Sequence, residues 1–220
     1  MIFKKRFSIL KLKYYATIPF LEYGKLDKFI SKYRLYAETL HLEDSAILEV
    51  GVGFGHGLGE IVLFQELHQD SRPVIAFDSF LGFPKGLKAD SHEFQKQGNK
   101  KYESFTLEFV LNYLKIIGVN DSEVNKIKFI KGFIPESLVE FPKVSIAFLN
   151  LDLDLYQPSL DALNFFWKYM STGGIILLDD YDSNSVQLKW PGVKLAVDEF
   201  CELNQIDILR CIGNQAYLKR

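Results

Sequence analysis

Short apolar runs alternate with amphipathic segments along most of the chain. Each run is bounded by polar or turn residues, a pattern typical of buried strands inside a parallel sheet. The runs that predict strands cover residues 46–50, 73–77, 127–130, 145–151 and 174–178. Apolar residues at helical spacing predict the helices, from the glycine-rich loop to about residue 68 and at residues 107–117, 135–141, 159–170 and 194–203.

The order of these elements predicts an α/β fold. Strands that alternate with helices form doubly wound, mostly parallel sheets. Pro158 is expected at the start of the helix over 159–170, and the Ser-Thr-Gly-Gly stretch at 171–174 is expected to end it. Two final runs, 206–212 and 215–219, are joined at Gly213-Asn214 and predict a closing hairpin, which would supply an antiparallel C-terminal edge strand.

Two segments lie outside this alternation. Residues 1–45 are aromatic with mixed helical spacing, and predict an N-terminal helical cap ahead of a main domain at 46–220. Residues 79–104 are polar and turn-rich, and they are long for a loop in a compact domain, which predicts a lid or substrate loop. His92 in this loop and Trp190 are candidates for the wall of an acceptor pocket.

Composition is that of a globular protein. The chain has 220 residues, 48% of them hydrophobic, which fits one domain. Two cysteines, Cys201 and Cys211, make no disulfide framework and fit a reducing cytosol. We find no stretch of ~20 apolar residues and no apolar region after the basic start, which argues against a membrane span or a signal peptide. The expected location is cytoplasmic.

Charge is unevenly distributed. The net charge of −2 gives no indication of nucleic acid as a partner. Residues 1–38, however, hold nine Lys/Arg and three Asp/Glu, so that this segment is basic and the remainder acidic. The ordinary interpretation is a solvated helix face, and an anionic substrate or a membrane surface is the alternative.

A glycine-rich loop follows the first predicted strand. Glycines at 51, 53, 55, 57 and 59 permit positive φ and let a ligand approach the main chain, beside a helix N-terminus that favours an anionic group. Glu49 at the end of the strand would oppose a pyrophosphate but suits a cationic ligand such as S-adenosyl-L-methionine. Asp78 at the end of the next strand is placed to accept hydrogen bonds from ribose hydroxyls, as in NAD sites. A dinucleotide-dependent oxidoreductase therefore stays open.

Two acidic clusters end two further strands. Asp152 and Asp154 follow the run at 145–151, and Asp179 and Asp180 follow the run at 174–178. If these strands are neighbours, the four carboxylates meet at the sheet edge where open α/β sheets bind ligands. A divalent metal, a cationic ligand or a proton transfer would explain such a cluster. Because no His or Cys pair has metal-ligand spacing, zinc is disfavoured.

Six ordered blocks between about residues 47 and 200 resemble class I S-adenosylmethionine-dependent methyltransferases, and within them the macrocin O-methyltransferase family. The glycine block begins at Glu49, and the later blocks are 77–84, 131–138, 151–159, 173–181 and 191–200. The resemblance implies a Rossmann-like methyltransferase fold with a seven-stranded sheet. It also implies Mg²⁺-dependent methylation of a hydroxyl of a sugar or glycosylated small molecule.

The resemblance also implies roles for individual residues. Asp152, Asp179 and Asp180 would bind the metal, and Asp154 would be the general base. Cofactor contacts are expected from Glu49, Gly51, Gly53, Gly55, His56, Asp78, Ser79, Gly132, Phe133 and Asp152. Leu153 stands where the family has glycine between the two acids, and Gln157-Pro158 stands in place of Glu-Ser. These departures leave a non-catalytic relative as an alternative, and the acceptor and the oligomeric state, a homodimer included, stay open.

Overall fold

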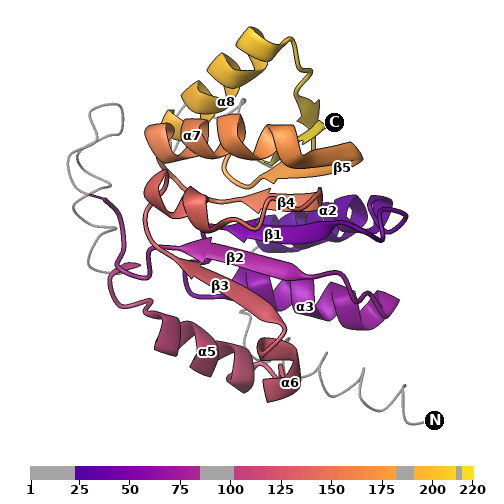
Figure 1. Ribbon diagram of the computed structural model, residues 1–220, viewed down its shortest axis with the longest axis vertical. Helices are drawn as coiled ribbons and strands as arrows, with labels where there is room; N and C mark the ends of the chain where they lie inside the picture. Colours follow the sequence, from indigo (N-terminus) through magenta and orange to yellow (C-terminus); the bar gives the residue numbers. More distant parts are fainter. Residues whose placement is uncertain (1–22, 85–101, 182–190, 212–214) are drawn as a thin grey trace.

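The seven strands of this protein form one mixed sheet. In the computed structural model, which describes residues 23–84, 102–181, 191–211 and 215–220, the strand order is β3-β2-β1-β4-β5-β7-β6 (Figure 1). The strands are β1 (Ala46–Val50), β2 (Val74–Asp78), β3 (Ile127–Lys131), β4 (Ile146–Leu151), β5 (Met170–Leu178), β6 (Leu209–Arg210) and β7 (Ala216–Lys219). The first five are parallel, and β7 runs antiparallel to β5 and to β6. The predicted doubly wound sheet with antiparallel C-terminal strands is confirmed.

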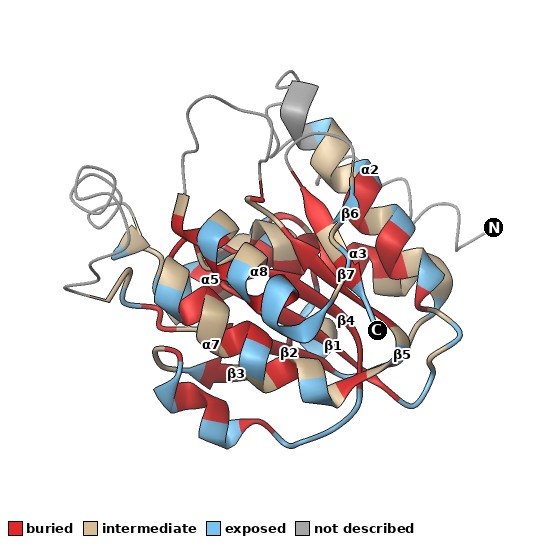
Figure 2. Ribbon diagram, turned by 90° about the horizontal axis from the view of Figure 1, so that it is seen from above, coloured by how far each residue is buried: buried red, intermediate tan, exposed pale blue. Residues whose placement is uncertain are grey.

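Helices cover both faces of the sheet (Figure 1). One face packs against α2 (Tyr23–Glu38), α3 (His56–His68) and α5 (Leu107–Ile116). The other packs against α7 (Tyr156–Phe166), α8 (Pro191–Asn204) and the 3₁₀ turn η1 (Glu136–Glu140). The remaining helical segments are α6 (Asp121–Val124) and the 3₁₀ turn η2 (Trp167–Tyr169). Figure 2 shows the buried residues gathered on the strands and on the inward faces of these helices.

Strand β1 illustrates why both faces are apolar. Its five residues are all buried, and alternate side chains point to opposite faces. Ala46, Leu48 and Val50 join the core beneath α7 and α8, and Ile47 joins the core beneath α2 and α3. Glu49 is in phase with Ile47, so its carboxyl group is directed toward α2 and α3.

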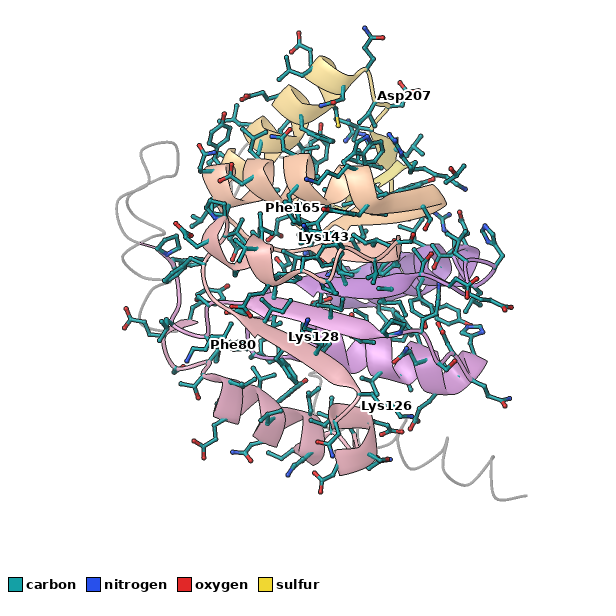
Figure 3. All side chains as sticks on the ribbon, viewed as in Figure 1. Phe80, Lys126, Lys128, Lys143, Phe165 and Asp207 are labelled. Carbon is teal, nitrogen blue, oxygen red and sulfur yellow. The ribbon has the colours of Figure 1, made fainter. Side chains whose placement is uncertain are left out.

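The sheet edges differ in length and polarity. One edge strand of the sheet is β3, in which Ile127 and Ile130 are buried. Lys128, labelled in Figure 3, lies on the same strand and is exposed. A lysine on an edge strand disfavours pairing with another sheet. The opposite edge is the two-residue β6, because β7 inserts between β5 and β6.

Register brings the carboxyl ends of the central strands level. Val50 pairs with Phe77 and with Leu151, and Leu151 pairs with Leu178. The ladder continues one residue further, since Asp152 N donates to Val50 O at 2.8 Å and Asp179 N donates to Leu151 O at 3.1 Å. The two acidic clusters therefore end neighbouring strands, as the sequence predicts.

Several predicted elements differ from the structure. β6, for example, covers only Leu209–Arg210, where a strand over 206–212 is expected. β5 begins at Met170, so residues 171–174 belong to the strand. Pairing with the C-terminus explains this, because Gly173 N donates to Arg220 O at 2.8 Å and Arg220 N donates to Gly174 O at 3.0 Å. α7 begins at Tyr156, which makes Pro158 its third residue. The four-residue α6, held by a capping box between Asn120 and Glu123, was missed.

The predicted cap and lid fall partly outside the described residues, as do His92 and Trp190. Within the cap, α2 places Leu35 and Tyr36 fully buried against the sheet. Within the lid, the rings of Phe83 and Tyr102 lie 4.7 Å apart, so the two described ends of that segment meet. Among the described residues no helix is both long and apolar enough to cross a membrane.

Candidate functional site

A cleft of about 670 Å³, including its open mouth, lies at the carboxyl ends of β1, β2 and β4. This is the edge at which open α/β sheets bind ligands. The walls of the cleft come from four places in the chain, namely the glycine loop, the ends of β2 and β3, the loop after β4 and the described ends of the predicted lid. The lining residues are Gly51, Gly53, Phe77, Asp78, Ser79, Gly82, Phe83, Pro84, Tyr102, Phe105, Gly132, Phe133, Ile134, Asp152, Leu153, Asp154, Leu155 and Pro158.

Gly51 lets two strand ends pass at close range. Its φ is +93°, and a Cβ added there would lie 1.9 Å from the backbone oxygen of Asp152. Any other residue would push the end of β1 away from the end of β4. The first glycine of the loop therefore fixes the distance between the cofactor side and the acidic side of the cleft.

Asp78 organises the glycine loop. One carboxylate oxygen accepts hydrogen bonds from the backbone N–H groups of Val52 at 2.8 Å and Gly53 at 3.0 Å. The other accepts from Phe80 N at 2.7 Å. Burial raises the pKa of Asp78 above its usual value, and these three hydrogen bonds oppose the rise. A carboxylate has further lone pairs, so the predicted contact with ribose hydroxyls stays sterically and chemically available.

Glu49 lies beneath the glycine loop and does not line the cleft. It is 1% exposed, and its Oε1 accepts a hydrogen bond from Asn150 Nδ2 at 3.1 Å. Within the described part of the chain its Oε2 has no hydrogen-bond partner. Burial raises the pKa of Glu49 to about 8, against the opposing effect of the Lys32 ammonium.

Lys32 forms a buried ion pair that joins α2 to α3. Its Nζ lies 2.8 Å from Glu60 Oε2, with side-chain exposures of 6% and 5%. His56 Nε2 lies 3.3 Å from the other oxygen of Glu60. Burial would raise the pKa of Glu60, but Lys32 and His56 outweigh it and lower this pKa to about 2. The first turn of α3 is thus tied by charge to α2.

Three carboxylates converge beside the cleft. One oxygen from each of Asp152, Asp154 and Asp180 lies within 4.8 Å of the others. Burial and the neighbouring carboxylates Asp179 and Asp180 hold the pKa of Asp152 well above its usual value. Such a group of hard oxygen donors fits a divalent cation such as Mg²⁺.

Asp179 has a different environment from the other three acids. Its Oδ2 accepts from Lys28 Nζ at 2.7 Å, and its Oδ1 accepts from Gln215 Nε2 at 2.6 Å. Burial would raise the pKa of Asp179, but Lys28 and Lys32 outweigh it and lower this pKa. Lys28 Nζ also lies 3.3 Å from Asp180 Oδ1.

In the turn after β4, the residue in the left-handed backbone conformation is an aspartate. Asp154 has φ +61°, whereas Leu153 has no positive φ and packs its side chain against the core. Aspartate is among the residues that tolerate this region without glycine's freedom. A leucine at 153 is therefore compatible with the turn that presents the buried Asp154 to the cleft.

A model described as Macrocin-O-methyltransferase (TylF) matches residues 37–216. The chain belongs to this family. A curated relative, the 8-demethyl-8-(2,3-dimethoxy-alpha-L-rhamnosyl)-tetracenomycin-C 4'-O-methyltransferase of Streptomyces olivaceus, is 31% identical over 140 residues, which are 61% of this chain and 52% of that protein. Mycinamicin III 3''-O-methyltransferase of Micromonospora griseorubida is 27% identical over 116 residues, 50% of this chain and 44% of that protein. This chain spans about half the length of the curated relatives it matches.

Solved structures show the same fold. The O-methyltransferase NovP superposes with a TM-score of 0.68 at 23% identity, over 86% of this chain and 79% of that one. The calicheamicin methyltransferase CalS11 also gives 0.68, at 22% identity, over 98% of this chain and 91% of that one.

The predicted site residues of this macrocin-O-methyltransferase family member divide into three groups. Those that line the cleft are Gly51, Gly53, Asp78, Ser79, Gly132, Phe133, Asp152 and Asp154. Glu49, Gly55 and His56 do not line the cleft, and Asp179 and Asp180 follow β5 without lining the cleft. The roles assigned to all these residues stay predictions. The two lysines of α2 were missed, although the basic excess of residues 1–38 was noted and assigned to a solvated face. Phe83 and Tyr102 line the cleft from within the predicted lid, although neither was named singly as a site residue.

Proposed function

We propose that this protein is an S-adenosylmethionine-dependent O-methyltransferase that uses Mg²⁺ and methylates a hydroxyl of a sugar. The proposal rests on two features that lie side by side. In a member of the macrocin-O-methyltransferase family, a glycine-lined cleft and a group of three carboxylates share one sheet edge. The names of the relatives include 4'-O- and 3''-O-methyltransferase activities, and the first name contains a rhamnosyl group. A rhamnose-like sugar on a small molecule or nucleotide is the acceptor class we favour.

The cleft suits the cofactor. Gly51 and Gly53 leave main chain exposed where a side chain would intrude, and Asp78 stands at the end of β2 for hydroxyl groups. Phe133 and Ile134 offer an apolar surface for an aromatic base on the opposite wall. S-adenosylmethionine, when bound there, would supply an electrophilic methyl group. Glu49 is buried beneath this loop, and its Oε2 has no hydrogen-bond partner among the described residues.

The acidic group suits Mg²⁺. By family resemblance Asp152, Asp179 and Asp180 would hold the ion, and Asp154 would act as the base. The carboxylates that converge in the structure are instead Asp152, Asp154 and Asp180, so Asp154 also stands within reach of the ion and Asp179 lies outside this group. When bound, the ion would favour the deprotonated form of a sugar hydroxyl. Asp154 is 6% exposed, and one of its oxygens lies within 4.8 Å of an oxygen of Asp152 and of Asp180. It would accept the proton of that hydroxyl as the hydroxyl oxygen bonds to the methyl carbon and the methyl–sulfur bond breaks, which would release S-adenosylhomocysteine. Tyr102 and Phe83 would exclude water from above the carboxylates.

Two measurements test this proposal. Calorimetry with S-adenosylhomocysteine, with NAD⁺ as the comparator, should give binding of the first ligand alone; binding of NAD⁺ alone would favour the oxidoreductase alternative. Asp154→Asn should lower kcat by about 10²-fold or more while S-adenosylhomocysteine affinity is kept. If the Asn variant turned over like the wild type, the proton-transfer role would be wrong. A protein that binds the cofactor but methylates no sugar would be the non-catalytic relative.

A further inference from the structure

Helix α2 places two lysines one turn apart over the candidate site. Lys32 is the buried partner of Glu60, and its side chain is 6% exposed. Lys28 has a side chain that is 27% exposed, and its ammonium lies between Asp179 and Asp180. α2 lies on the same side of the sheet as α3 (Figures 1 and 2). Lys32 therefore fixes the helix, while Lys28 extends from the helix to the acidic cluster.

Asp179 and Asp180 already accept hydrogen bonds from other side chains. Lys28 Nζ is 2.7 Å from Asp179 Oδ2 and 3.3 Å from Asp180 Oδ1. Gln215 Nε2 donates to Asp179 Oδ1 at 2.6 Å. Both oxygens of Asp179 and one oxygen of Asp180 thus already receive protein donors. A divalent cation at Asp179 would have to share an oxygen with Lys28 or Gln215, and at Asp180 it would share the carboxylate group with Lys28.

We propose that Lys28 is an internal cation that competes with the metal ion for Asp179 and Asp180, and thereby sets the metal affinity of this site. The inference rests on the proposed function. Lys28 offsets one of the four formal negative charges on Asp152, Asp154, Asp179 and Asp180, and its ammonium contacts two of the carboxylates that would hold the ion. Two cations at that range repel, and burial strengthens the repulsion relative to water. The partly exposed lysine can turn toward solvent while Lys32 keeps α2 in place.

Metal affinity is the first test. Mn²⁺, whose free ion is measured by electron paramagnetic resonance, serves as the probe for wild type, Lys28→Met, Lys28→Arg and Lys115→Met. Lys28→Met should bind Mn²⁺ about tenfold more tightly than wild type, because a competing positive charge is removed. Lys28→Arg, which keeps the charge, should bind no more tightly than wild type. Lys115→Met is the matched control, because Lys115 is an exposed lysine 3.0 Å from Asp121 on another part of the surface. Equal or weaker binding by Lys28→Met would overturn the proposal.

Displacement of the ammonium is the second test, and it stands even if Lys28→Met fails to fold. Amine-selective labelling of the wild type, read by mass spectrometry, should label Lys28 several-fold faster when Mn²⁺ is added, with Lys115 unchanged. An unchanged rate at Lys28 under saturating Mn²⁺ would refute displacement.

The two proposals fail in distinguishable ways. If the wild type binds Mn²⁺ and Lys28→Met binds it no more tightly, the competition proposed for Lys28 is overturned and the proposed function is not. If neither wild type nor Lys28→Met binds Mn²⁺, the proposed metal dependence fails and the competition fails with it. Calorimetry with S-adenosylhomocysteine on the same samples then shows whether the cofactor part of the proposed function survives.

Discussion

Replacement of Lys32 by methionine should strongly destabilise the fold. Methionine preserves most of the side-chain volume but leaves Glu60 buried without its cation, beside the fully buried Glu49. The Lys32–Glu60 pair is 2.8 Å long, with side chains 6% and 5% exposed. Removing one partner of a buried pair typically costs about 3–5 kcal/mol, because the remaining charge stays in a medium that solvates it poorly. Domains are stable by only about 5–15 kcal/mol, so the loss is a large part of the total.

The assay is urea unfolding at pH 7, followed by tryptophan fluorescence and circular dichroism, together with thermal melting. A loss of about 3–5 kcal/mol corresponds to a fall in Tm of roughly 6–20 °C for a chain of this size. The double variant Lys32→Met/Glu60→Gln should recover much of the loss, since no uncompensated charge remains at that position. Lys115→Met, which breaks a pair with side chains 54% and 77% exposed, should change stability by less than about 1 kcal/mol. A loss below about 1 kcal/mol in Lys32→Met would refute the reasoning.

Three further predictions concern the loop and the charges beneath it. Gly51→Ala should lower the free energy of unfolding in urea by about 3 kcal/mol or more, because its Cβ would meet the Asp152 backbone oxygen at 1.9 Å. Gly53→Ala has open space around its Cβ and should lower it by only about 1–2 kcal/mol. Equal losses in the two variants would contradict this reasoning. Glu49 has its pKa raised to about 8 in the fold, so its contribution to stability is present below its unfolded pKa near 4.5 and declines as pH rises through 8. Glu49→Gln should therefore flatten the fall in unfolding free energy between pH 5 and 9, and an unchanged profile would count against it. Asp78→Ala should weaken S-adenosylhomocysteine binding about tenfold or more in calorimetry, because two backbone N–H groups of the glycine loop and that of Phe80 lose their acceptor. An unchanged affinity would show that the loop keeps its conformation without Asp78.

The local pattern of apolar residues was sufficient to predict most of the fold. Continuous apolar runs such as 46–50 and 146–151 need no partner to be recognised as buried strands, and parallel register then brings their ends level. The extension of β5 back to Met170 was not predictable, since it depends on hydrogen bonds with Arg220, far along the chain. α6 was missed because four residues carry too little periodicity.

The candidate site was predictable to the level of residue type and sheet edge. Asp152, Asp154 and Asp180 converge because they directly follow neighbouring strands. The surroundings of Glu49 and Asp179 were not predictable, because each is decided by a lysine from α2, and no local signal shows which carboxylate a helical lysine will reach. Glu49 was expected at the cofactor, yet strand alternation directs it to the helix side of β1.

Methyl transfer itself is the most direct test of the central claim. The purified protein is incubated with S-adenosylmethionine labelled in the methyl group and with rhamnosides, nucleotide-linked rhamnose and other sugars as acceptors. Each reaction is run with Mg²⁺, with EDTA, and with EDTA followed by excess Mg²⁺, and products are identified by mass spectrometry. We expect a labelled sugar that is lost with EDTA and restored by Mg²⁺. Transfer that is unaffected by EDTA would contradict the metal's role, and cofactor binding without transfer to any sugar would contradict the proposed activity.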